Sequence, residues 1–336
     1  MSHRHLDLYG EHETEVSRGG DEASLHRHYA SCPKNPDHGG FIPIRSFSMQ
    51  HLPQDQQDPD VYNLVQAVAD LTVRIDVKMI SPNRPQYWPG TTVPYPFYNM
   101  SNCQIMRTGT GSVRAIKYIE GQGLDALNRS KNLCLQDYRT LYKTCPCLEC
   151  KPSGEKNNTW WEIEVTTATH VIFDENEASH TICRLFFDEQ NSPSVILANL
   201  RILTNNISNI ERDSCSLIYN TCDATLGDKL FRMSENYYRL LKKIEDKNEE
   251  KSHFTFIVSH PHGCPKQVSL GDWTDHYKGE ECGDYVKSKL TYTTCTCPGS
   301  SGAKVYSARF YCLVHSGTLS TGLNYSSTGL YPKADK

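Results

Sequence analysis

The sequence lacks the features that mark membrane proteins, secreted proteins and nucleic-acid-binding proteins. No apolar run approaches the roughly 18 residues that a membrane-spanning helix needs. The first residues, Met1–Asp7, contain neither an apolar core nor a small-residue cleavage site, so no secretory signal is expected. The 35 Lys and Arg against 39 Asp and Glu give a net charge of −4, which argues against a broad nucleic-acid-binding surface. We therefore expect a cytoplasmic protein, with secretion as the lesser alternative, and no nucleic-acid or membrane partner.

Cysteine is too sparse for a scaffold held together by disulfides. The 336 residues include 14 Cys, about 4%, whereas such scaffolds exceed about 8–10%. In a reducing compartment most of these side chains are free thiols. Three of them, Cys145, Cys147 and Cys150, crowd into six residues, and thiolates are good zinc ligands. They form a weak candidate for structural zinc, with Cys134 suggested as a fourth ligand; an exposed thiol-bearing loop and a disulfide are the alternatives.

Paired apolar residues are also scarce at the start of the chain. Residues 1–57 are rich in His, Asp, Gln, Gly and Pro, so they bury too little surface to offset chain entropy. We predict a disordered, His-rich extension there. Behind Pro59 and Asp60, apolar residues at helical spacing predict a docked helix, and five prolines within 81–96 predict an extended connector. Together these two elements make up residues 58–99.

Short apolar runs separated by turn residues dominate the rest of the chain. Their pattern predicts an all-β fold with many short strands rather than alternating strands and helices. A charged helical segment over 234–251 interrupts them. The predicted strands cover 111–119, 160–167, 181–187, 194–203, 216–219, 254–258, 266–270, 289–296 and 305–314.

The segment 297–303 carries the most informative motif. Its core, Gly299-Ser300-Ser301-Gly302, places a serine hydroxyl in a tight turn that glycines permit. The backbone N–H groups of Gly299 and Ser301 would then point at one developing oxyanion. Alone, this pattern is common in surface turns. Ser300 is a rival nucleophile, but it lacks a following glycine, so Ser301 is preferred.

Residues 160–170 form a predicted strand that ends in Thr-Ala-Thr-His, which resembles the histidine box of chymotrypsin-like serine proteases. Asp213 precedes a short apolar strand, as the aspartate of that family does; Asp223, which follows the strand, is the alternative. The chain order is then His170, Asp213, Ser301, which is the order found in chymotrypsin.

The resemblance implies two antiparallel β-barrels of chymotrypsin-like type within residues 100–326. His170 and Asp213 belong to the first barrel, about 100–230, and Ser301 to the second, about 252–326. The implied activity is that of a serine endopeptidase acting on a peptide or protein through an acyl-enzyme, without a cofactor. Ser301 is then the nucleophile, His170 the general base, and Asp213 the group that orients the imidazole. The alternative is an inactive, protease-like binding module, possibly stabilised by zinc.

The resemblance also indicates a substrate preference. In trypsin-like relatives the residue six before the nucleophile lies at the base of the primary specificity pocket, and Cys295 occupies this position without a fixed charge. His315, followed by Ser316 and Gly317, resembles the pocket histidine of glutamyl endopeptidases. Thr296 adds a hydroxyl donor on the opposite wall. We expect cleavage after Glu, with Gln or Asp second; the alternative is that His315 only packs between the barrels. A second His-rich group, residues 260–264, is more typical of a turn than of a metal site.

Overall fold

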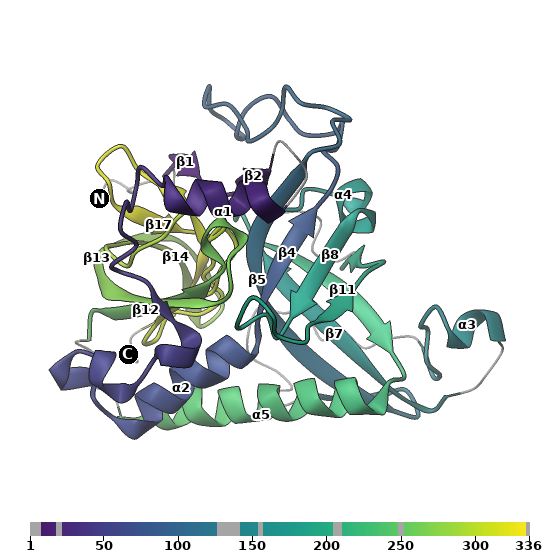
Figure 1. Cartoon of the computed structure of the whole chain (residues 1–336). Coiled ribbons are helices and arrows are strands. Elements are labelled where there is room, and N and C mark those ends of the chain that lie inside the picture. The colour runs from purple at the N-terminus through teal and green to yellow at the C-terminus, as the bar shows by residue number, and fades with distance from the viewer. Residues whose placement is uncertain are drawn as a thin grey trace.

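Two antiparallel sheets dominate the computed structural model, which describes residues 8–17, 22–125, 142–153, 157–203, 210–247 and 252–333. The sheets lie side by side, and one long helix runs beneath the first of them (Figure 1). The all-β prediction with a few added helices is thus confirmed. The first sheet follows the order β10-β11-β7-β5-β4-β8-β9, with β2 and β6 also paired to β5. The second follows β1-β16-β17-β14-β13-β12-β15, with β18 on β14 and β3 on β13.

The strands of the first sheet are β2 (Glu15–Ser17), β4 (Thr72–Val77), β5 (Met106–Ile119), β6 (Gln122–Asp125), β7 (Thr159–Thr167), β8 (Thr181–Leu185), β9 (Val195–Leu197), β10 (Arg201–Ile202) and β11 (Cys215–Thr221). Those of the second are β1 (Glu11–His12), β3 (Ile42–Pro43), β12 (Phe254–Ser259), β13 (Gln267–Cys282), β14 (Tyr285–Tyr292), β15 (Val305–Ser307), β16 (His315–Thr318), β17 (Asn324–Ser326) and β18 (Gly329–Pro332). The helices are α1 (Glu22–Ala30), α2 (Pro59–Asp70), α3 (Cys150–Ser153), α4 (Glu175–Ser179) and α5 (Ala224–Lys247), with 3-10 turns η1 (Ile44–Ser46), η2 (Met49–His51), η3 (Gln54–Gln56) and η4 (Pro261–Gly263).

Helices α2 and α5 pack against each other below the sheets (Figure 1). The predicted docked helix is α2, and it buries Leu64 and Val65 completely. The predicted helix over 234–251 is α5, which begins ten residues earlier because Asp223 accepts hydrogen bonds from the first backbone N–H groups of the helix. Residues 248–251 lie outside the described part. One hydrophobic core runs from these helices into both sheets.

The N-terminal region differs from the expected disordered extension. Of residues 1–57, the described ones form β1 to β3, α1 and three 3-10 turns, while residues 1–7 and 18–21 lie outside the description. Leu25, Phe41 and Phe47 are buried. These apolar residues are too far apart in the sequence to give a helix or strand period, but each packs against a different part of the main domain. Their tertiary contacts offset the chain entropy that the local sequence cannot.

The segment 58–99, predicted to be a docked helix and an extended connector, also contains a central strand. β4 pairs with both β5 and β8, and all six of its residues are buried. Its sequence alternates polar and apolar residues, yet both faces are buried, and Arg74 on the polar face pairs with Asp76 at 2.9 Å inside the protein. The first sheet therefore extends well before residue 100.

Candidate active site

His170 and Asp213 meet because β7 and β11 are antiparallel. β7 ends at Thr167, which pairs with Cys215 at the start of β11, so the residues just beyond these ends lie together. His170 Nδ1 lies 2.9 Å and 3.0 Å from the two carboxylate oxygens of Asp213. The backbone N–H of His170 donates to the same carboxylate at 3.1 Å. The carboxylate thus fixes both the ring and the backbone of His170.

Ser301 comes from the turn between β14 and β15 of the second sheet. His170 Nε2 lies 2.7 Å from Ser301 Oγ, so the three predicted side chains form one continuous hydrogen-bonded row. The turn is held on the first sheet, since the backbone N–H of Thr110 donates to Ser301 O at 2.8 Å. Gly302 is required here: its φ is +84°, and a Cβ would lie 2.0 Å from Thr167 Oγ1.

The two rival residues lie elsewhere. The hydroxyl of Ser300 contacts Ser259 Oγ at 3.1 Å and accepts a hydrogen bond from the backbone N–H of Cys297 at 3.2 Å. Asp223 caps α5 and is not part of the row. The alternatives for nucleophile and aspartate that the sequence leaves open are therefore not brought together with His170.

Asp213 is buried yet suited to remain ionised. Burial raises the pKa of its carboxyl, but the adjacent imidazole of His170 and the hydrogen bonds it accepts lower that pKa further, so the net shift is downward. One of these bonds comes from Ser316 Oγ at 2.6 Å. An ionised Asp213 keeps a proton on Nδ1 of His170 and leaves Nε2 free to accept the proton of Ser301.

The backbone N–H groups of Gly299 and Ser301 converge on one oxygen atom. Both donate to the carbonyl oxygen of Glu13, at 2.7 Å and 3.2 Å. The loop reaches this conformation through Gly299, whose φ is +100° and whose Cβ would meet His260 O at 2.4 Å. The two donors are thus aimed as an oxyanion hole requires, and Glu13 is a site residue that nothing in the sequence pattern indicates.

The segment around Glu13 crosses the site as an extended peptide. β1 pairs antiparallel with β16, with Glu11 opposite Thr318 and His12 opposite Gly317. The close approach needs Gly317, because a Cβ there would lie 2.1 Å from the carbonyl oxygen of Glu11. The backbone N–H of Glu13 donates to Ser301 Oγ at 3.0 Å. The predicted Gly317 therefore lines the strand against which this peptide lies.

The carboxylate of Glu13 is buried against His315. Its Oε2 lies 2.6 Å from His315 Nε2, and its Oε1 contacts the ammonium of Lys34 and, at 3.2 Å, Thr318 Oγ1. Tyr292 holds the other side of the imidazole, with its hydroxyl 2.7 Å from Nδ1. Burial raises the pKa of Glu13, but His315 and Lys34 outweigh it and lower the pKa to about 2.

The remaining predicted pocket residues have different positions. Thr296 Oγ1 accepts from Lys34 Nζ at 2.9 Å, so it orients the cation rather than contacting the carboxylate of Glu13. Cys295 packs beside a buried group that includes Cys32 and Cys297. Lys34 was not indicated by the sequence, because it lies far from the pocket along the chain.

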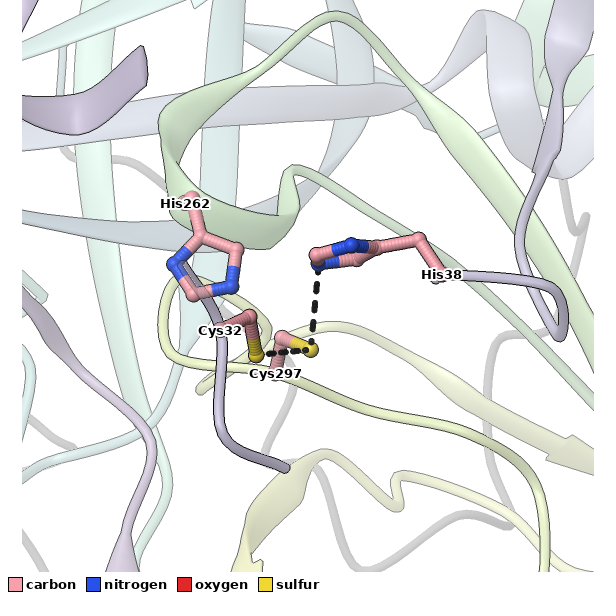
Figure 2. A group of neighbouring side chains, drawn as sticks. All are labelled: Cys32, His38, His262 and Cys297. Atoms are coloured by element: carbon pink, nitrogen blue, oxygen red, sulfur yellow. Dashed lines mark hydrogen bonds between the residues drawn. The ribbon is translucent and has the colours of Figure 1, made fainter. Parts of the chain in front are cut away.

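Two clusters in the described residues are suited to a metal ion. The first, which we call the Cys145 cluster, comprises Cys145, Cys147, Cys150 and Cys222, whose sulfur atoms lie within 4.8 Å of one another. The suggested ligand Cys134 lies outside the described residues, and Cys222, just after β11, stands in the fourth place. The second, the Cys32 cluster, comprises Cys32, His38, His262 and Cys297 (Figure 2).

Known proteins that are similar to this chain were found among solved structures. A scan against family models and a search of curated proteins found no match. Similar solved structures include the HtrA-type protease AlgW with a tripeptide, at 11% identity, TM-score 0.37, 79% of this chain and 58% of that one. The inactive form of the Rv3671c protease is also similar, at 10% identity and a TM-score of 0.36, over 81% of this chain and 90% of that one. A third is the thermostable serine protease AL20 from an extremophilic microorganism, at 10% identity and a TM-score of 0.36, over 79% of this chain and 92% of that one. The match thus spans less than two thirds of the AlgW chain.

The arrangement of two antiparallel sheets, with His170 and Asp213 on the first and Ser301 on the second, is consistent with the chymotrypsin-like architecture that the resemblance predicts. No helix in the described part of the chain has the length and apolar character to cross a membrane.

Proposed function

We propose that this chain is a serine endopeptidase that cleaves peptide bonds after glutamate through an acyl-enzyme. The observation that carries the proposal is the position of Glu13. Its carbonyl oxygen accepts two backbone N–H groups beside Ser301 Oγ, while its carboxylate contacts His315. Glu13 thus lies as the residue before a cleaved bond would lie, with its carbonyl at the proposed oxyanion hole and its side chain at the proposed specificity residue.

The chemistry follows from the row of hydrogen bonds. His170 Nε2 takes the proton of Ser301 as its Oγ attacks the substrate carbonyl carbon. The negative charge that develops on the carbonyl oxygen is stabilised by the N–H groups of Gly299 and Ser301. The imidazolium, stabilised by Asp213, then protonates the leaving amine, and water releases the acyl group by the same route.

Glutamate is favoured because the pocket supplies donors and a positive charge inside a buried space. His315 Nε2–H and Lys34 both face the carboxylate of Glu13, and His315 is fully buried. An apolar side chain would leave these groups unpaired, and an Arg or Lys would add a like charge beside Lys34. Gln retains the acceptor oxygen without the charge, so it ranks second together with the shorter Asp.

The converging N–H groups also favour an active enzyme over an inactive binding module. A collapsed oxyanion loop turns one N–H away from the site, whereas here both donate to the same oxygen. We therefore keep the enzyme as the proposed function.

Peptides that differ only at the residue before the cleaved bond test this proposal. Full-length protein should cleave the Glu peptide best and the Arg peptide least. Ser301→Ala should lower kcat by at least about 10⁴-fold, whereas the adjacent Ser300→Ala retains the nucleophile and serves as the matched control. His315→Ala should reduce the Glu-to-Gln preference more than it reduces kcat on Gln. Dominant cleavage after Arg or Lys would contradict the proposed specificity.

The Cys145 cluster supports a second, structural role, and we propose that it holds a zinc ion. Cys150 Sγ lies 3.5 Å and Cys147 Sγ 3.9 Å from Cys222 Sγ, near the sulfur spacing of tetrahedral zinc, about 3.8 Å. The backbone N–H of Cys150 donates to Cys147 Sγ at 3.4 Å, a contact that stabilises a thiolate. Zinc content that is unchanged by Cys222→Ser would refute this role.

A further inference from the structure

The Cys32 cluster brings together four side chains from three distant parts of the chain. Cys32 and His38 flank a short turn after α1, His262 lies in η4, and Cys297 precedes the turn that carries Ser301. Figure 2 shows these side chains pointing toward one another, and their ligand atoms all lie within 4.8 Å. All four residues are buried, so the cluster is closed to solvent.

The distances match a tetrahedral metal site. Cys32 Sγ and Cys297 Sγ are 3.6 Å apart, and Cys297 Sγ lies 3.7 Å from His38 Nε2. Tetrahedral zinc with ordinary bond lengths separates two sulfurs by about 3.8 Å and a sulfur from a nitrogen by about 3.5 Å. The same sulfur separation is too long for a disulfide bond, which measures about 2.05 Å.

The groups around the cluster orient its side chains for binding a metal. Glu15 Oε2 lies 2.5 Å from His262 Nδ1, which fixes the ring, while His262 Nε2 is buried and has no hydrogen-bond partner. A carboxylate on one ring nitrogen with the other turned to a metal is the usual arrangement of a zinc-bound histidine. Asn35 directs its backbone N–H to Cys32 Sγ at 3.4 Å and its side-chain amide to Cys297 Sγ at 3.1 Å.

Both histidines also adopt an uncommon backbone conformation. The φ angles are +47° at His38 and +51° at His262, a region that residues other than glycine rarely occupy. Such conformations persist where the surrounding structure or a ligand demands them. Here each one accompanies a ring that faces the two sulfurs.

We propose that Cys32, His38, His262 and Cys297 bind a structural zinc ion that fixes the oxyanion loop. Two Cys and two His complete a tetrahedron and leave no open position, which is typical of a structural site. The loop rests directly on η4, since a Cβ on Gly299 would lie 2.8 Å from the backbone nitrogen of His262. The ion would therefore tie η4, the loop and the N-terminal turn together, so its ligands are positioning residues rather than catalytic ones.

Zinc counted per chain in the full-length protein tests the proposal. His262→Asn should lose one equivalent relative to wild type, because an Asn amide can still donate to Glu15 but cannot replace Nε2. His260→Asn is the matched control: His260 is buried two positions before His262 and its Nε2 also lacks a partner, but it lies outside the cluster. It should retain the zinc content of wild type. Equal zinc in His262→Asn and wild type overturns the proposal, as does a Cys32–Cys297 disulfide found by mass spectrometry of the native protein.

A ligand exchange keeps the test valid if His262→Asn does not fold. His262→Cys offers a third thiolate, and in cobalt-loaded protein it should retain tetrahedral absorption bands and gain thiolate-to-cobalt intensity. The Cys222→Ser background isolates this cluster from the Cys145 cluster. An unchanged cobalt spectrum in His262→Cys contradicts coordination by residue 262.

A second inference concerns the segment around Glu13, which crosses the active site. Glu13 has its carbonyl oxygen between the two N–H donors and its backbone N–H on Ser301 Oγ, and Thr14 follows on the leaving-group side. Beyond the bond the chain is anchored, because Glu15–Ser17 forms β2 against β5 and Glu15 contacts His262. The segment before the bond is held mainly by the site itself, through β1 and the pocket.

We infer, on the basis of the proposed function, that the Glu13–Thr14 bond is cleaved by the chain's own Ser301. Ser301 Oγ bonds to the Glu13 carbonyl carbon, the C–N bond to Thr14 breaks, and His170 passes the Ser301 proton to the Thr14 amine. Water then hydrolyses the ester, giving a carboxylate on Glu13 and restoring Ser301. Departure of residues 1–13 opens the pocket to other substrates, while β2 stays in the sheet.

Intact mass and N-terminal sequencing of the full-length protein test this inference. Wild type should convert to a chain that begins at Thr14, at a rate independent of protein concentration, whereas Ser301→Ala should stay intact. Glu13→Gln should slow the conversion at least tenfold. Glu13→Ala removes the carboxylate contacts with His315 and Lys34 that hold the uncut segment, so added Glu peptides should displace this segment and be cleaved without any delay. If wild type cleaves Glu peptides but no Thr14 end forms, self-cleavage is wrong and the proposed function stands. If Glu13→Ala cleaves no peptide either, the proposed function is the part that fails.

Discussion

The Cys145 cluster and the Cys32 cluster differ in how their ligands are spaced along the chain. Three ligands of the Cys145 cluster fall within six residues, and α3, which begins at Cys150, lies on the side of the first sheet away from the second sheet (Figure 1). In the Cys32 cluster, Cys32 and Cys297 are 265 residues apart, and the cluster adjoins the turn that holds Ser301. One cluster is mostly local, while the other joins the ends of the fold at the active site.

The difference in ligand spacing predicts which property of the protein each cluster would affect. The Cys145 cluster packs against Ile116, Tyr118 and Trp160 at the end of the first sheet, so a metal bound there would support stability. A metal in the Cys32 cluster constrains segments that no continuous strand or helix connects, and one of them supplies the oxyanion donors. Metal binding to the first should thus affect unfolding, and metal binding to the second should affect catalysis as well.

The largest expected effect comes from the Cys32 cluster. His262→Asn should lower kcat/KM on a Glu peptide by about 100-fold, because a displaced loop loses oxyanion donors, each worth about 10²–10³ in kcat. Steady-state kinetics at one pH measures this, and Cys222→Ser is the control, with kcat/KM within about twofold of wild type. Equal losses in the two variants would remove the distinction between the clusters.

The next effect concerns stability alone. Cys222→Ser should lower the unfolding midpoint by about 5–10 °C, since a lost structural metal site costs several kcal/mol and each kcal/mol shifts the midpoint of a chain this size by about 2–4 °C. Thermal unfolding followed by circular dichroism measures it. Cys103→Ser, at a cysteine outside both clusters, should shift the midpoint by no more than about 1 °C. A midpoint in Cys222→Ser that matches this control would contradict a structural metal there.

The smallest expected effect is a pH dependence of stability that distinguishes two buried glutamates, one near each cluster. Glu13 pairs with His315, whereas burial and the nearby Glu164 raise the pKa of Glu162, beside Tyr118, to about 7. A carboxyl whose folded pKa is raised stabilises the fold below pH 4.5, and this contribution is lost as pH rises through about 7. At pH 8 the free energy of unfolding of Glu162→Gln, measured by denaturant titration, should therefore exceed that of wild type by about 1–3 kcal/mol. This gain in stability should vanish near pH 4.5. A gain that is constant from pH 4.5 to 8 would exclude this cause.

Local sequence signals predicted the strands around the candidate catalytic residues well. Alternation over 160–167 and 254–258 corresponds to β7 and β12, because each strand has its own apolar period and bounding turn residues. The helix over 59–70 was equally visible, since Asp58, Pro59 and its apolar face are all local features. β4 was missed although its residues alternate between polar and apolar, because two of them, Arg74 and Asp76, are charged, and only the ion pair between them allows both to be buried.

What the sequence by itself determined was the set of chemical groups: a histidine after a strand, an aspartate before one, a serine between glycines, and His315 further on. Those assignments depend on short motifs, and the structure brings His170, Asp213 and Ser301 into contact with one another and His315 into contact with Glu13. Only the tertiary structure decided that Glu13 and Lys34 complete the pocket and that Cys222, Cys32 and His38 complete the two clusters. These residues lie tens to hundreds of positions from their partners, and no local period or spacing encodes a contact made by folding two sheets together.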